Sequence, residues 1–305
     1  MPSSYDPPMD ATGIITQEEM HRSMMLVRLQ IATPLSLLMT IGSNLVCALA
    51  VKPGLAEINK QYPTLLSPNA ILLGLYWIVV YALQIGFCLI LVTARKDETK
   101  NTLVHGVGLR FAIANWLQAA WAVAWTLKFF MISEIIVILN VLNLLSIQLT
   151  LLSHPSSPRH RPLDTLFIHA PMTLFFVILF TLDWLHNGFI ALNWLSLPEL
   201  KNPYAKTWQA VLVLFLVHGA LAVWVALRLD FWATLGGMWT LLIILLGNQR
   251  KPTPEVVTIV ILLVLHPVAL VGGLAWKKTK EREGRIRLEE EAGEGMRPYD
   301  DEVEE

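Results

Sequence analysis

The feature that most constrains this chain is a series of apolar runs, each about as long as a bilayer is thick. A helix needs about 20 mostly apolar residues to cross roughly 30 Å of hydrocarbon, and a helix satisfies its own backbone hydrogen bonds there. Eight such runs occur, at 29–51, 70–93, 106–127, 129–152, 164–187, 207–227, 231–247 and 255–276. The pattern predicts an all-α fold, a polytopic transmembrane helical bundle of about eight spans over 29–276.

Two of the apolar regions are too long for one span, and we predict a hairpin in each. A single helix over 106–152 would be about 70 Å long, more than twice the bilayer core. Lys128 interrupts this region, and the segment from Arg228 to Asp230 interrupts 207–247. We therefore place a turn at each of these two points.

Charge is scarce inside the bundle and dense at the end of the chain. Only 15% of the residues are charged and 54% are hydrophobic, whereas soluble domains carry about 25% charged residues. Polar segments at 1–28 and 277–305 flank the spans, and the second, with its acidic end, is expected to be largely disordered. Its basic residues lie beside a membrane rather than on one face, which argues against nucleic-acid binding.

The positions of lysine and arginine predict the orientation. In an eight-span arrangement, 16 of them lie on the side of both termini and 7 on the opposite side. Because basic loops stay in the cytosol, both termini are predicted to be cytosolic. The bilayer is the one partner that the sequence names. Endomembrane and plasma membrane are both open, and the oligomeric state does not follow from the sequence.

Polar side chains inside the spans are the sharpest functional signal, because hydrocarbon penalises them. Those placed toward the non-cytosolic side or near mid-depth are Glu134, Asn140, Asn143, Asp183 and His186. Asp183 and His186 are three residues apart, so they share a helix face and could pair. Together these residues predict a pocket that opens to the non-cytosolic side. The alternative is hydrogen bonding that only joins helices.

Two histidines, His218 and His266, fall near the middle of their predicted spans. They can be satisfied core residues, ligand contacts or proton carriers. A haem-bearing bundle would need facing histidines at matched depth, and this pair alone qualifies. A zinc hydrolase would need three clustered ligands, and no H-E-x-x-H signature is present. The sequence therefore assigns no cofactor or metal and does not favour an enzyme.

The tryptophan pattern carries a family resemblance over about 68–275. Trp77 and Tyr81, after Pro68, resemble the W-x-x-[IV]-Y of the second span of tryptophan-rich sensory proteins. The segment from Gln118 through Trp121 to Trp125 is similar to that family's N-A-A-W-x-x-A-W. Trp239 corresponds to a tryptophan of a later helix in the same group. Packing or anchoring at the membrane surface is the other interpretation of these tryptophans.

The chain departs from the family pattern at two points. Gln118 stands in place of the family's asparagine, and His169 to Met172 replace a Tyr-x-Gly-Trp. The chain thus resembles the extended relatives of the translocator-protein family rather than its compact five-helix members. The resemblance implies a helical bundle that binds a hydrophobic or tetrapyrrole-like ligand, and it settles no catalytic role.

We therefore predict a membrane bundle that binds a small hydrophobic molecule in an intramembrane pocket. The aromatic residues Trp77, Tyr81, Trp121 and Trp125 would form its apolar walls, and the polar residues named above would orient the ligand. One alternative is a proton-coupled secondary transporter in which Asp183, Glu134 and His218 carry the coupling. Another is a scaffold whose charged tail recruits cytosolic partners.

Overall fold

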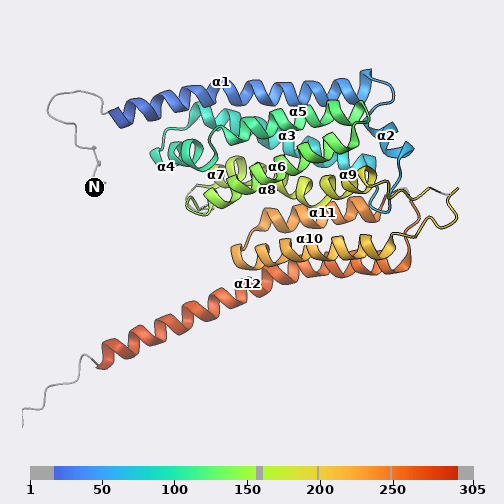
Figure 1. Ribbon diagram of the computed structural model, residues 1–305. Coiled ribbons are helices and arrows are strands. Elements are labelled where there is room, and N and C mark those ends of the chain that lie inside the picture. The colour runs from blue at the N-terminus through green and yellow to red at the C-terminus, as the bar shows by residue number, and fades with distance from the viewer. Residues whose placement is uncertain (1–16, 156–160, 198, 248, 295–305) are drawn as a thin grey trace, which may run out of the picture.

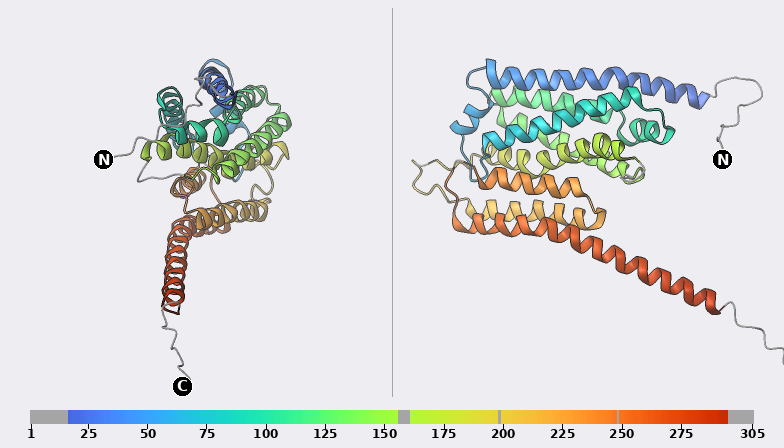
Figure 2. Two further views of the ribbon diagram at one scale, coloured as in Figure 1. Left: turned by 90° about the vertical axis from the view of Figure 1, so that its left-hand side faces the viewer. Right: turned by 180° about the vertical axis from the view of Figure 1, so that it is seen from behind.

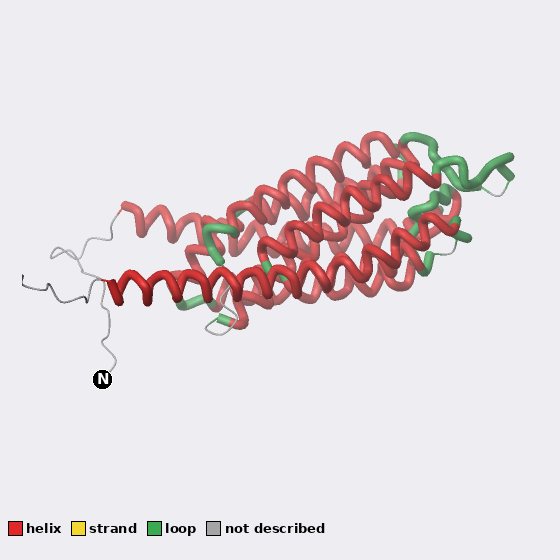
Figure 3. Tube along the Cα trace, turned by 90° about the horizontal axis from the view of Figure 1, so that it is seen from below, coloured by secondary structure: helices red, strands yellow, loops and turns green. Residues whose placement is uncertain are grey.

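The computed structural model describes residues 17–155, 161–197, 199–247 and 249–294, and every regular element in this part of the chain is helical. Long rods lie side by side and alternate in direction, with the connecting segments gathered at the two ends (Figures 1 and 3). In chain order the rods are α1 (Gln17–Leu45) continued by η1 (Val46–Ala50), α3 (Ala70–Thr93), α5 (Arg110–Thr126), α6 (Phe130–Leu151), a fifth rod over 162–191, α10 (Thr207–Arg228), α11 (Phe231–Leu245) and α12 (Thr253–Glu294).

This architecture confirms the predicted all-α bundle of about eight spans. Within the described residues, six helices are long and apolar enough to cross a membrane. The rods α5 and α11 are shorter, with 17 and 15 residues, and they pack against longer neighbours. Both predicted hairpins are confirmed: Lys128 and Leu229 turn the chain with φ of 61° and 55°, in the left-handed region that ends helices.

The fifth rod is the centre of the bundle. It consists of α7 (Pro162–Asp164), η3 (Thr165–His169), α8 (Ala170–Ile178), η4 (Leu179–Asp183) and α9 (Trp184–Ala191). Of the 18-residue apolar stretch that identifies it as a span, 72% is buried inside the protein, against 22–39% of the corresponding stretches in the other five long helices. The N-terminal rods lie on one side of it and α10 to α12 on the other (Figure 2). A helix in this position meets protein on all faces, so its polar residues meet protein groups rather than lipid.

The two ends of the bundle differ in what closes them (Figure 1). The start of α1 and the end of α12 lie at the same end, which we call the termini end and which also holds α4 (Asp97–Asn101) and η2 (Thr102–Val107). The opposite end, called the α2 end, holds α2 (Leu55–Gln61). An even number of rods places both termini at one end. The side of the membrane that each end faces stays a prediction.

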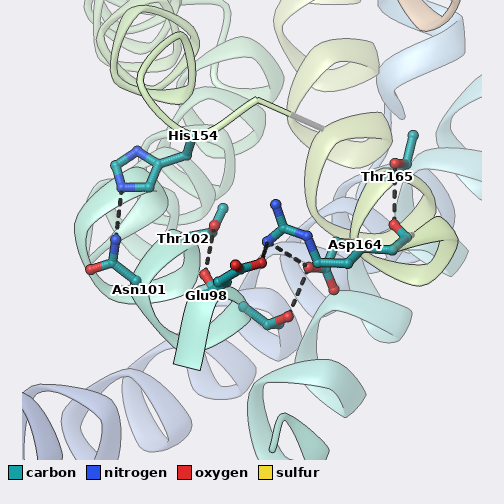
Figure 4. Close-up of polar contacts among 8 residues, drawn as sticks. Glu98, Asn101, Thr102, His154, Asp164 and Thr165 are labelled. Carbon is teal, nitrogen blue, oxygen red and sulfur yellow. Dashed lines mark hydrogen bonds and ion pairs between the residues drawn. The ribbon is translucent and has the colours of Figure 1, made fainter. Parts of the chain in front are cut away.

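A polar cluster joins α4 to the start of the fifth rod at the termini end (Figure 4). The guanidinium of Arg161 lies 3.4 Å from Glu98 and 3.5 Å from Asp164. The hydroxyl of Thr99 donates to the same Asp164 carboxylate at 2.7 Å. These contacts occupy the charge of Arg161 and fix the start of the central rod against α4.

The last helix extends beyond the predicted span. α12 continues to Glu294, so 277–294 is helical where the sequence analysis expected disorder. Lysine, arginine and glutamate are good helix formers, and Lys277 and Glu281 form an i,i+4 pair at 4.0 Å. A helix that leaves the bilayer with this composition has no reason to stop there. The first sixteen residues and the acidic end at 300–305 lie outside the described residues.

Candidate ligand-binding pocket

Two pairs of aromatic residues, one on α3 and one on α5, meet at the α2 end. In each pair the residues are four apart, so they share a helix face. The ring centroids of Trp77 and Tyr81 are 5.5 Å apart, and the indoles of Trp121 and Trp125 stack at 5.6 Å. The i,i+4 spacing thus sets two parallel aromatic ridges on neighbouring helices.

These four side chains line one cavity of about 380 Å³. The remaining walls come from the end of α1, from η1, from α2 and from the start of α3, and include the amides of Asn44 and Asn59. Two wall residues, Leu45 and Ile78, are 54% and 64% exposed, so the cavity reaches the outer surface of the bundle. In a bilayer that surface faces lipid, which gives a hydrophobic molecule a route into the cavity.

One hydrogen-bond donor in the cavity wall is free. The indole nitrogen of Trp121 is buried, and no group in the described part of the chain accepts its hydrogen. A buried polar group left without a partner costs about 1–3 kcal/mol. A ligand that carries an acceptor would remove this cost on binding.

His186 stands behind the aromatic wall and is held from two directions. Its Nδ1 lies 2.9 Å from the hydroxyl of Thr64, and its Nε2 lies 3.4 Å from Oδ1 of Asn59. A carbonyl oxygen only accepts, so Nε2 carries the proton and Thr64 donates to Nδ1. The ring of Trp125 is 6.1 Å away. His186 therefore joins the cavity residues Asn59 and Trp125 through a neutral imidazole.

The loop that carries Thr64 is anchored by a buried ion pair. The ammonium of Lys251 lies 3.1 Å from the carboxylate of Glu255, and their side chains are 3% and 0% exposed. Lys251 also donates to the backbone carbonyl of Leu65. Burial lowers the pKa of Lys251, and the Glu255 carboxylate opposes that shift. The pair holds the polar side of the pocket to the start of α12.

Asp183 and His186 do not form the pair that their spacing suggested. Both ring nitrogens of His186 are engaged elsewhere, and Oδ2 of Asp183 is buried with no hydrogen-bond partner among the described residues. The physical reason is competition for the imidazole: Thr64 and Asn59 reach its two ring nitrogens from the loop and from α2.

Glu134 is part of a polar contact between α6 and α9. Its Oε2 accepts a hydrogen bond from the amide of Asn187 at 2.9 Å, and Ser133 donates to the Oδ1 of that same amide at 3.0 Å. A Cβ added at Gly188 would lie 3.1 Å from Glu134. The helices are therefore close enough here to bury a carboxylate against an amide.

The remaining predicted amides join helices away from the cavity. Asn140 donates to the carbonyl of Ala114 at 3.0 Å, and Asn143 donates to the carbonyl of Arg110 at 2.8 Å. Both bonds tie α6 to the backbone of α5. Gln118 is buried on α5, with 1% exposure. The arrangement matches the helix-joining alternative for Asn140 and Asn143.

His218 and His266 face each other from α10 and α12, as matched depth suggested. Nδ1 of His218 and Nε2 of His266 are 3.2 Å apart, and both residues are fully buried. A metal between two ring nitrogens needs about 4 Å, with roughly 2 Å to each. The pair is thus a direct hydrogen bond between helices. In the described residues, no group of three or more histidine, cysteine or acidic side chains is placed to hold a metal.

Sequence reasoning missed three partners in these contacts, Asn59, Thr64 and Asn187. Asn187 lies at the end of a predicted span and carries the same kind of polar side chain as Asn140, so the sequence pattern could have identified it. Asn59 and Thr64 lie between spans in polar sequence, where nothing distinguishes them from ordinary loop residues. Only the folding of α2 and its loop over the bundle brings them to His186.

The fold and the cavity define a polytopic helical membrane protein with an aromatic pocket between its helices. The chain matches the family model described as TSPO-like protein over residues 30–273. It therefore belongs to the TSPO-like family, which confirms the resemblance found in its second and third spans. Comparisons with curated proteins and with solved structures found no match.

Proposed function

We propose that this protein binds a small hydrophobic or tetrapyrrole-like molecule in the cavity at the α2 end. The observation that carries the proposal is that Trp77, Tyr81, Trp121 and Trp125 line one cavity and that the Trp121 N–H has no acceptor among the described residues. Ligand pockets are mostly apolar concavities of about 300–1,000 Å³ with a few placed polar groups. The volume of about 380 Å³ suits a compact amphiphile or one part of a larger ring system.

The contacts assign a role to each part of the wall. The stacked indoles of α5 and the aromatic pair of α3 offer flat faces to a planar ligand. The Trp121 N–H donates to an acceptor on the ligand. Asn59, held by His186, presents its amide at the edge nearest α2. The ligand thus needs one apolar face and one acceptor.

The test is a titration of the purified protein with a panel of tetrapyrroles and sterols, in which the change in intrinsic tryptophan fluorescence reports binding. Trp121→Phe keeps the ring and removes the donor, so it should weaken binding about threefold to tenfold, the value of one hydrogen bond of roughly 1 kcal/mol. The matched control is Trp116→Phe on the same helix, because Trp116 is 45% exposed and lies outside the cavity. Folded protein that binds no member of the panel would contradict the proposal.

Proton-coupled transport is the second candidate, and Asp183 favours it. One of its carboxylate oxygens is buried without a partner in the described part of the chain, at the end of a π-helical segment in the most buried long helix. Such a group could take up a proton. The other two residues of that hypothesis are already paired, Glu134 with Asn187 and His218 with His266. Reconstitution separates the two functions, since transport moves a solute into sealed vesicles and binding alone does not.

A further inference from the structure

A second, larger cavity lies at the termini end, away from the aromatic pocket. It measures about 710 Å³ and is enclosed by the end of α6, the first half of the fifth rod, the α10–α11 hairpin and α12. Its lining mixes polar and apolar side chains, among them Gln148, His169, Trp224, Arg228 and Lys277. Nothing in the proposed function uses this cavity.

Two cations face this cavity at the edge of the bundle. Arg228 is the last residue of α10, and Lys277 follows the apolar part of α12. Lys277 forms an ion pair with Glu281 at 4.0 Å, and both side chains are more than 60% exposed, so this pair is weak. Arg161, by contrast, is occupied by Glu98 and Asp164 (Figure 4). The cavity therefore presents positive charge that its own side chains neutralise only in part.

One carboxylate, that of Asp230, also lines the cavity. It caps α11 by accepting the backbone N–H of Ala233 at 3.0 Å, and it receives a hydrogen bond from Thr173. Burial raises the pKa of Asp230, and these hydrogen bonds and Arg228 oppose the shift. Asp230 therefore caps the hairpin and offsets part of the charge of Arg228, and the two cations still outnumber this one carboxylate among the lining residues.

A buried donor supplies the second, independent observation. Gln148 of α6 lines the cavity and is only 5% exposed. Its side-chain nitrogen is buried and has no acceptor among the residues that the structure describes. An amide N–H left without a partner is costly in an apolar surrounding, and an anionic oxygen is the acceptor that would satisfy it.

An apolar groove lies next to this cavity, toward the middle of the bundle. It measures about 370 Å³, and Trp224 lines both spaces. Three of the rods that line the cavity, α6, the fifth rod and α10, also form the walls of the groove. The groove residues lie one to three turns farther from the termini end, with Leu145 on α6, Phe176 on α8 and Leu221 on α10. A polar, cationic space and an apolar one thus share a wall at Trp224, and together they offer both surfaces that a lipid needs.

We propose that the cavity and the groove together bind one anionic phospholipid. The phosphate lies between Arg228, Lys277 and the amide of Gln148, and an acyl chain lies along Trp224 into the groove. A free phosphate would use the first space and leave the second empty, so the groove favours the lipid. If the termini are cytosolic, the site faces the leaflet that is rich in anionic lipid. The site is independent of the aromatic pocket.

The experiment is native mass spectrometry of the full chain in neutral detergent with dioleoyl phosphatidic acid. Dioleoyl phosphatidylcholine, glycerol phosphate and inorganic phosphate are run in parallel. We expect saturable binding of phosphatidic acid and binding of phosphatidylcholine at least tenfold weaker. Arg228→Gln and Lys277→Gln should each weaken the binding of phosphatidic acid about fivefold, since a basic residue near the surface contributes about 1 kcal/mol. The matched control, Lys278→Gln, removes the neighbouring charge outside the cavity and should leave binding unchanged.

The outcomes separate the claims. Equal losses in Lys277→Gln and Lys278→Gln would overturn the site in favour of diffuse attraction by the basic segment. Equal binding of inorganic phosphate and phosphatidic acid would overturn the lipid assignment. Should Arg228→Gln fail to fold, Lys277→Gln decides, because Lys277 is exposed and its loss leaves the core intact. Gln148→Leu removes the buried donor, so it should weaken the binding of phosphatidic acid and of phosphatidylcholine by the same factor.

Discussion

The two ends of the bundle carry pockets of opposite chemistry on the same helical frame. At the α2 end the cavity walls are aromatic, and the polar groups behind them bond mainly to one another, as His186 does with Thr64 and Asn59. At the termini end the cavity is lined by Arg228 and Lys277, with an amide donor that has no acceptor among the described residues. This difference is the basis of our two proposals, an apolar molecule at one end and an anionic amphiphile at the other.

The ends also differ in how they are held. A buried ion pair, Lys251 with Glu255, fastens the loop at the α2 end. Arg228 and Lys277, the cations that line the cavity at the termini end, are exposed. A wall fastened by buried charges suits recognition by shape, whereas exposed charges suit recognition of a phosphate. Three changes test this contrast, from the largest expected effect to the smallest.

Lys251→Met should destabilise the protein most, by about 3–5 kcal/mol, because it leaves the fully buried carboxylate of Glu255 without its partner. The free energy of unfolding in detergent measures the effect. The paired change Lys251→Met with Glu255→Leu removes both charges and should recover most of the loss. A single variant as stable as the natural protein would show that the α2 end does not depend on this pair.

Asp230→Ala should lower the free energy of unfolding by about 1 kcal/mol, because α11 at the termini end loses its N-cap. Asp230→Asn keeps a capping oxygen and removes the charge, so it should leave the thermal midpoint nearly unchanged and tighten phosphatidic acid binding. The same two substitutions should not alter binding in the aromatic pocket. If Asp230→Asn weakened the binding of phosphatidic acid, Asp230 would belong to the phosphate contacts and the proposed charge balance would be wrong.

Glu57→Gln should have the smallest effect, on α2 alone. The hydrogen bond from Lys52, and then that from the Gly54 backbone, lower the pKa of Glu57 from its ordinary value of 4.5. A depressed carboxyl pKa stabilises the fold above the unfolded-state pKa, and this stability is lost as the pH falls through the folded value. The natural protein should thus melt slightly above the variant at neutral pH, and the two should converge below about pH 4. A gap that persists in acid would assign the effect to shape rather than charge.

The spans and both hairpins were predictable because hydropathy is a local property of the chain. Lys128 and the Arg228–Asp230 segment interrupt apolar runs too long for one crossing, and the chain turns there. The aromatic walls were also predictable, since an i,i+4 spacing places two rings on one face of any α-helix. The same rule was misleading for Asp183 and His186, because both ring nitrogens of His186 bond to Thr64 and Asn59, which lie far away in the sequence.

The end of the last helix illustrates a different limit. Hydropathy located where the apolar span ends, near Trp276, and the charge beyond it was interpreted as disorder. The helix continues to Glu294 because leaving the lipid does not by itself break a helix of lysine, arginine and glutamate. A change of solvent and a change of conformation are separate events along a chain.

The sequence by itself determined that this chain crosses a membrane about eight times, where it turns, and that two adjacent spans carry aromatic ridges. Those properties depend on neighbours within a few residues. Only the tertiary structure decided which polar residues meet: His218 with His266, Glu134 with Asn187, and His186 with a loop more than a hundred residues away. Most buried polar groups find a partner in the fold, and the packing of the helices selects which one.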